Sequence, residues 1–202
     1  MILNPYRFAV AASYWNSADK AATAVLSDSN KQVNRTTGTP PPTSVRAVKS
    51  ITAGKGYFEI ATTSNYTGPV GNQFGGVCES VSLLDKSPAD LNVTGNYVSV
   101  RDNSSWYKND VSQGTHAGGG WGSGSGARVV ILGVAYDAGT RGLTFYDNGV
   151  SVVTTSLSGT DPAFPFCTIL NGANEAFGLV LRVKASEFTY GIPSGYTAWA
   201  DV

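Results

Sequence analysis

Residues 129–153 decide the predicted fold, and they read VVILGVAYDAGTRGLTFYDNGVSVV. The first eight of these residues are apolar at almost every position, which is typical of a central strand buried on both faces. The turn at 137–142 contains Gly139 and Gly142, and glycine takes positive φ angles without steric cost. We therefore expect one buried strand that ends in a glycine-containing turn.

The second half of the same segment continues the pattern with two more strands. Residues 143–146 alternate, with Leu143 and Phe145 on one face and Thr144 and Tyr146 on the other. The Asn148-Gly149 pair that follows is the strongest short signal for a type I′ hairpin turn. The whole segment is therefore predicted to form an antiparallel three-stranded meander.

This pattern resembles the core of the SPRY domain, in which a run "GV..D...G.L.FY.NG" forms adjacent strands. Three further stretches agree in chain order: GKGYFEI at 54–60 resembles "GK.YFE", FGGVC at 74–78 a "GV" strand, and FPF at 164–166 a late "YP" strand. The ending FTYGIPSGY at 188–196 is similar to the tail of SPRY-like modules in phage and bacterial proteins. The resemblance covers residues 22–199.

The chain of 202 residues has the length of one all-β domain. The resemblance implies a two-sheet antiparallel β-sandwich of the SPRY and concanavalin A-like jelly-roll kind, with little or no helix. We divide the chain into an aromatic N-terminal segment, 1–21, and the sandwich, 22–202. The first segment is expected to be an extra strand or a docking arm. A helical turn is allowed within 18–22, and a strand is expected from Thr23 onward.

Charge and hydropathy exclude several classes of function. The sequence has 14 basic and 14 acidic residues, with no run of either sign, so a nucleic-acid-binding stripe is absent. No apolar stretch approaches the length of a membrane span, and the N-terminus is a poor signal peptide. We expect a protein that folds in a cytoplasm and does not insert into membranes.

Two cysteines, Cys78 and Cys167, lie in predicted strands. They could form a disulfide that joins two strands, and we favour two buried free thiols. The Pro-rich segment at 38–43 could be a ligand for a partner, and we favour a stiff connection between the sheets.

The sequence carries no recognisable catalytic or metal-binding motif. A single histidine and two distant cysteines exclude the common zinc patterns, and no nucleophile elbow or phosphate loop is present. No paired-carboxylate run of a lectin-like glycosidase occurs, and Glu59 is expected to have a structural hydrogen-bonding role. We predict a protein that is not an enzyme and has no cofactor or metal.

Binding is the function that remains, because SPRY domains are recognition modules that use loops at one edge of the sandwich. Loops rich in aromatic and uncharged hydrogen-bonding residues suit sugars or protein hot spots. Residues 113–126, QGTHAGGGWGSGSG, are expected to be an exposed loop because so much glycine cannot pack itself. The predicted ligand- or partner-binding residues are Tyr66, Asn103, Trp106, Tyr107, His116 and Trp121. For Trp106 and Trp121 the alternative is that they close the ends of the core.

Two functional classes follow. The first is a bacteriophage virion protein, such as a host-surface adhesin, a tail or fibre component or a capsid decoration protein, that contacts a protein or a cell-surface glycan and could form a homo-oligomer. The second is a cytoplasmic SPRY-type adaptor for protein–protein interaction. A lectin-like glycan-active enzyme is a third and weaker alternative.

Overall fold

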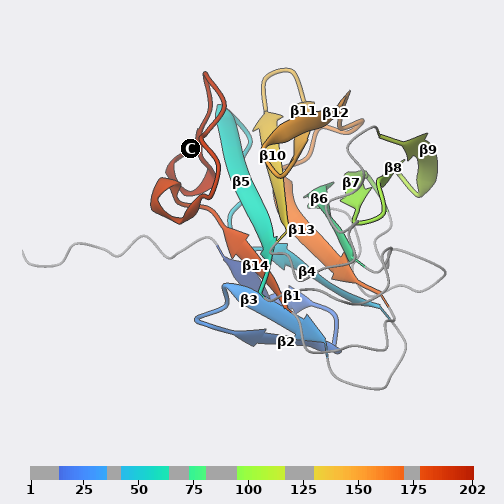
Figure 1. Cartoon of the computed structure of the whole chain (residues 1–202), viewed down its shortest axis with the longest axis vertical. Coiled ribbons are helices and arrows are strands. Elements are labelled where there is room, and N and C mark those ends of the chain that lie inside the picture. Colours follow the sequence, from blue (N-terminus) through green and yellow to red (C-terminus); the bar gives the residue numbers. More distant parts are fainter. Residues whose placement is uncertain (1–13, 36–41, 64–72, 81–94, 117–129, 171–177) are drawn as a thin grey trace, which may run out of the picture.

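The computed structural model describes residues 14–35, 42–63, 73–80, 95–116, 130–170 and 178–202. In these ranges the chain forms strands and two 3₁₀ helices, η1 (Ala185–Glu187) and η2 (Trp199–Asp201). The strands build two antiparallel sheets that pack face to face (Figure 1). The predicted all-β, two-sheet sandwich is therefore confirmed.

The first sheet has seven strands in the spatial order β1-β4-β13-β6-β7-β8-β9. Their bounds are β1 (Trp15–Lys20), β4 (Thr43–Ala47), β6 (Gln73–Glu79), β7 (Tyr97–Arg101), β8 (Ser105–Lys108), β9 (Val111–Thr115) and β13 (Ala163–Ile169).

The second sheet has the order β12-β11-β10-β5-β14-β3-β2, and the short β15 pairs with β5 in parallel. Its strands are β2 (Ala24–Ser27), β3 (Gln32–Arg35), β5 (Lys55–Thr62), β10 (Ile131–Asp137), β11 (Gly142–Asp147), β12 (Val150–Ser156), β14 (Leu179–Arg182) and β15 (Thr197–Ala198).

The core lies between the two sheets and is built from alternating inward-facing side chains. Phe58, Leu132 and Phe145 from the second sheet meet Val77 and Val98 from the first, and all five are fully buried. Burial of each such side chain contributes about 1.5–3 kcal/mol to folding. The central strand β10 is buried from Ile131 to Tyr136, as its apolar sequence predicts.

The meander at 129–153 largely follows its sequence. Leu143 and Phe145 are buried, while Thr144 and Tyr146 on the other face are half-buried. Asn148 and Gly149 have φ angles of 47° and 85°, as a type I′ turn requires. The alternation and the Asn-Gly turn are therefore confirmed.

The turn at 137–142 differs from its prediction. The residue with positive φ is Arg141, at 60°, and neither glycine of this turn lies in the left-handed region. Asp137 explains the difference, because its Oδ1 accepts the N–H groups of Gly139 at 2.9 Å and Thr140 at 3.3 Å. The aspartate therefore stabilises the turn in place of glycine flexibility.

Two further stretches differ from what the sequence analysis allowed or expected. Residues 15–20 form β1, which pairs with β4, so the helical turn that the sequence allowed within 18–22 does not form there. Trp15 is fully buried and its Nε1 donates to the carbonyl of Leu179, so tertiary burial outweighs the helical spacing. Residues 113–115, expected to lie in a loop, belong to β9, in which Thr115 pairs with Ser105 of β8. Residues 1–13, 36–41 and 117–129 lie outside the described ranges. The division of the chain into an N-terminal segment and a sandwich at 21/22 stays a prediction.

Both cysteines are free and buried, as expected. They lie in the neighbouring strands β6 and β13, where the register pairs Cys78 with Phe164 and Cys167 with Gly75. Burial raises the pKa of the Cys78 thiol to about 12, although Arg46 opposes the shift. Cys78 is therefore a protonated, apolar side chain at neutral pH.

Two buried carboxylates hold the sandwich together, and one of them is Glu59 on β5. Its oxygens accept the backbone N–H groups of Thr189 at 2.8 Å and Tyr190 at 2.9 Å, together with the Tyr57 hydroxyl at 3.3 Å. Arg182 on the neighbouring β14 completes the site at 3.3 Å. The structural role that the sequence predicts for Glu59 is confirmed.

The second buried carboxylate is Glu79 at the end of β6. It forms an ion pair with Arg141 from the turn before β11 and accepts a hydrogen bond of 2.8 Å from Asn96. Arg141 also donates to the carbonyl of Asp161 at 3.0 Å. Because β6 and β11 belong to different sheets, this pair joins the two layers.

We predict that Glu59→Ala lowers the free energy of unfolding by about 3–5 kcal/mol, because it leaves the Arg182 guanidinium without its ion-pair partner and the part-buried N–H groups of Thr189 and Tyr190 without their acceptor. Urea unfolding followed by circular dichroism measures this change. Asp201→Ala, which removes an exposed carboxylate, is the control and should change stability by less than about 0.5 kcal/mol. A loss below about 1 kcal/mol for Glu59→Ala would contradict the structural role of this carboxylate.

Candidate binding surfaces

Four of the six predicted site residues lie at one corner of the first sheet, formed by β7, β8 and β9, which we call the β7–β9 corner. Trp106 and Tyr107 are on β8, Asn103 is in the turn between β7 and β8, and His116 directly follows β9. Figure 1 shows β9 at one side of the molecule, away from the C-terminal segment. The other two predicted residues, Tyr66 and Trp121, lie outside the described ranges.

Trp106 and Tyr107 point to opposite faces of β8. Trp106 packs against the core between the sheets, whereas Tyr107 packs against a separate cluster on the outer face of the first sheet, which includes Tyr97 and Phe166. The reason is the two-residue period of a strand, which sends neighbouring side chains to opposite sides. The two aromatic residues therefore cannot form one stacking surface, and Trp106 closes the core as the sequence analysis allowed.

Asn103 has a clear structural role. Its Oδ1 accepts hydrogen bonds from the backbone N–H of Ser105 at 3.1 Å and from the Ser105 hydroxyl at 2.5 Å, which stabilises the turn into β8. His116 is half-buried, and its backbone N–H donates to the backbone carbonyl of Ser104 at 3.0 Å. Burial lowers the pKa of the His116 imidazole. His116 is therefore favoured in its neutral form. A binding role for these residues stays a prediction.

The β8–β9 hairpin is held rigidly to β7 by Tyr97. Its hydroxyl donates to Asp110 Oδ1 at 3.0 Å and accepts the Asp110 N–H at 3.2 Å, while its own N–H donates to Asn109 Oδ1 at 3.0 Å. Asn109 and Asp110 both have positive φ angles, as a two-residue hairpin turn requires. The conformation of the β8–β9 hairpin is therefore fixed by the fold before any partner binds.

Strand β9 is exposed at every residue, and its sequence, VSQGT, has no charge. In the part of the chain that the structure describes, β9 pairs only with β8 and ends the sheet. Val111 is 60% exposed, and Gly114 has a φ of 99° in open space. An exposed and uncharged edge strand is a template for pairing with another chain.

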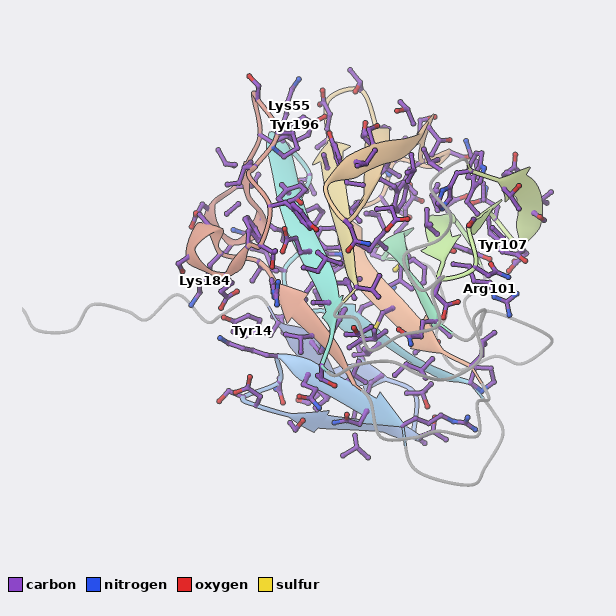
Figure 2. All side chains as sticks on the ribbon, in the orientation of Figure 1. Tyr14, Lys55, Arg101, Tyr107, Lys184 and Tyr196 are labelled. Atoms are coloured by element: carbon purple, nitrogen blue, oxygen red, sulfur yellow. The ribbon has the colours of Figure 1, made fainter. Side chains whose placement is uncertain are left out.

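The structure also shows a second surface, which the sequence analysis did not select. Tyr146 on β11, and Tyr190 and Tyr196 in the C-terminal segment, are half-buried and lie on the outer face of the second sheet. Tyr146 packs edge-to-face on Tyr57 with ring centroids 6.2 Å apart, and the Lys55 ammonium lies 5.8 Å from the Tyr196 ring centroid. We call these three tyrosines the tyrosine face. Figure 2 labels Lys55 and Tyr196 together, and Tyr107 on the other side of the molecule.

Each ring of the tyrosine face lies close to another part of that face. Burial raises the pKa of Tyr146, and the adjacent Tyr196 adds to this shift. The Tyr190 ring lies over Gly149, where a Cβ atom would be 2.6 Å from the ring. The Glu59 carboxylate accepts the Tyr190 N–H and thereby places this ring.

The sequence predicts only part of the tyrosine face. The alternation of β11 predicts that Tyr146 points away from the core, but it does not say what lies beside it. Tyr190 and Tyr196 belong to the stretch at 188–196, which resembles the tail of SPRY-like modules. The sequence does not predict which residues these two tyrosines contact. Tyr190 is placed by its bond to Glu59 on β5, and Tyr196 by the pairing of β15 with β5, and no local pattern reveals either contact.

In the described ranges, no group of three or more His, Cys, Asp or Glu side chains could hold a metal ion. Glu59 and Glu79 are both bound by arginine and by further donors within the fold. Among the same residues, no helix has the length and apolar character needed to span a bilayer.

We predict that Gly149→Ala destabilises the protein by about 1–3 kcal/mol, because it places a Cβ at positive φ against the Tyr190 ring. Thermal unfolding measures the change. Gly191→Ala in the same region is the matched control, since no atom lies within 4 Å of the added Cβ, and it should change stability by less than about 0.5 kcal/mol. Equal losses in the two variants would show that Tyr190 does not pack on this turn.

Comparison of the sequence with family models and with curated proteins finds no match. Comparison of the structure finds SPRY domains. The human HERC1 SPRY domain has a TM-score of 0.59 at 13% identity, covering 83% of this chain and 96% of that chain. The TRIM65 PSpry domain has 0.56 at 19%, covering 83% and 90%, and a human SPRY domain has 0.56 at 15%, covering 79% and 94%. By fold, this chain is therefore a SPRY-like β-sandwich.

Proposed function

We propose that this protein is a non-catalytic binding module that recognises a protein partner through the β7–β9 corner. The observation that carries the proposal is strand β9, which is exposed along its whole length and carries no charge. The SPRY-like fold supports it, because SPRY domains are recognition modules.

The chemistry of the corner suits a protein partner. The edge of β9 offers backbone donors and acceptors to an extended segment, and strand addition of this kind supplies affinity through main-chain hydrogen bonds. Half-buried Tyr107 provides an aromatic contact beside the strand, and Lys108 on the same hairpin provides a charged rim. Because Tyr97 and Asp110 already hold the hairpin in place, little conformational entropy is lost on binding.

Substitution of Val111 by Glu tests the corner. The variant places a charge on the exposed edge and should lower the affinity for a partner at least about tenfold, which corresponds to about 1.4 kcal/mol. Proteins that bind the immobilised wild-type chain are identified first, and the affinity of each purified binder is then measured by calorimetry.

Val25→Glu is the matched control, because Val25 is an exposed valine, at 48%, on the edge strand β2 of the other sheet. It should leave the affinity unchanged. A binder that tolerates Val111→Glu, or one that is lost equally in both variants, would contradict recognition at this corner.

We further propose that the module works in a bacteriophage virion, as an adhesin, a tail or fibre component or a decoration protein, with a cytoplasmic adaptor as the alternative. The support is the resemblance of the tail at 188–196 to SPRY-like modules in phage and bacterial proteins. Mass spectrometry of gradient-purified particles should then find the chain in a fixed copy number. Recovery only in the soluble cell fraction would favour the adaptor.

A further inference from the structure

The tyrosine face is a second surface with properties that differ from those of the β7–β9 corner. Tyr146, Tyr190 and Tyr196 are half-buried, and short hydroxyl-bearing side chains lie on the strand next to Tyr146. The register places Ser151 of β12 opposite Tyr146, and Thr154 opposite Thr144. Ser151 and Thr154 are both exposed.

The rings are fixed by the fold before any ligand binds. Tyr146 rests on buried Tyr57, Tyr190 rests on Gly149 and is tied through its N–H to Glu59, and Tyr196 precedes β15, which pairs with β5. Tyr57 in turn packs edge-to-face on Phe188, with centroids 5.0 Å apart. Preorganised aromatic rings lose little entropy on binding, so even a small contact area contributes to affinity.

The charged side chains that border this face are compensated. Lys55 forms an ion pair with Asp137 at 3.0 Å, and Arg182 forms one with Glu59 at 3.3 Å. The Lys55 side chain is nevertheless 49% exposed, so its ammonium can still donate to a ligand oxygen. The face therefore offers aromatic rings, hydroxyl groups and one donor, and little net charge to attract an ion.

We propose that the tyrosine face binds a neutral saccharide. A pyranose ring has an apolar face of C–H groups that packs against an aromatic ring, and a rim of hydroxyl groups that need hydrogen-bond partners. Tyrosine serves both needs, because its ring is apolar and its hydroxyl donates and accepts. The charge balance matches a ligand without carboxylate, sulfate or phosphate groups.

A protein partner fits this face less well than a saccharide. Protein hot spots need an apolar centre that is shielded from water by surrounding contacts. Here the exposed residues of β12 beside Tyr146 and Thr144 are Ser151 and Thr154, and Val150, at 67% exposure, is a large aliphatic side chain at the margin. Hydroxyl groups at short reach favour a ligand that is itself rich in hydroxyl groups.

The test is a screen of the full chain against an array of neutral oligosaccharides built from glucose, galactose, mannose and N-acetylglucosamine. The best binder is then titrated by calorimetry against Tyr146→Ala and Tyr196→Ala. Each substitution should lower the affinity at least tenfold. Tyr196→Phe keeps the ring and should lose less than Tyr196→Ala.

Tyr107→Ala is the matched control, because it removes a half-buried tyrosine from the β7–β9 corner, and it should leave saccharide affinity unchanged. The melting temperature of every variant is measured, and two positions are used so that unfolding of one does not decide the result. The array readout is independent of Val111→Glu, so failure of the protein-binding proposal is separable from failure here.

Three results would overturn the saccharide assignment. The first is that the wild-type chain binds no neutral oligosaccharide on the array, and the second is that binding survives in both alanine variants. The third is that the Tyr146→Ala substitution abolishes binding of a purified protein while saccharides are not bound. That outcome would make the tyrosine face a protein-docking site.

Discussion

The hydrogen bonds and the ion pair of the buried Glu59 carboxylate are the interactions that position the C-terminal segment on the second sheet. A charge removed from water is stable only when donors surround it, and here two backbone amides, a tyrosine hydroxyl and an arginine do so. Two of those donors come from the C-terminal segment, about 130 residues further along the chain. Glu59 therefore ties the end of the chain over the outer face of β5.

That tie has a direct consequence for the molecular surface. The C-terminal segment covers the outer face over β5, so Tyr57 is buried there, while the outer face of β11 and β12 stays open. At the boundary between the covered and open regions, Tyr190 lies over Gly149 and Tyr196 lies near Tyr146. Glu79 and Arg141 join the two sheets, with the Arg141 guanidinium 5.5 Å from the Tyr136 ring centroid. Of the two buried carboxylates, Glu79 thus links the two layers, and Glu59 holds the C-terminal segment on β5.

The two candidate surfaces lie on different sheets and differ in chemistry. The β7–β9 corner presents a strand edge, whose main-chain groups suit an extended polypeptide. The tyrosine face presents rings and hydroxyl groups, which suit a compact neutral ligand. Because the two proposed surfaces lie on different sheets, binding of a protein at one leaves the other free for a saccharide.

The sequence by itself determined the meander of β10, β11 and β12, because the period of two in residues 143–146 and the Asn148-Gly149 turn are local properties of the chain. It also determined that Glu59 would be structural, through the motif at 54–60. The helical spacing before Thr23 was misleading, since burial of Trp15 against β14 outweighs local propensity. Likewise, Trp106 and Tyr107 were grouped by composition, whereas the pleat of β8 separates them. Only the tertiary structure decided that Tyr146, Tyr190 and Tyr196 converge, because contacts between distant segments depend on hydrogen bonds and packing that no local pattern records.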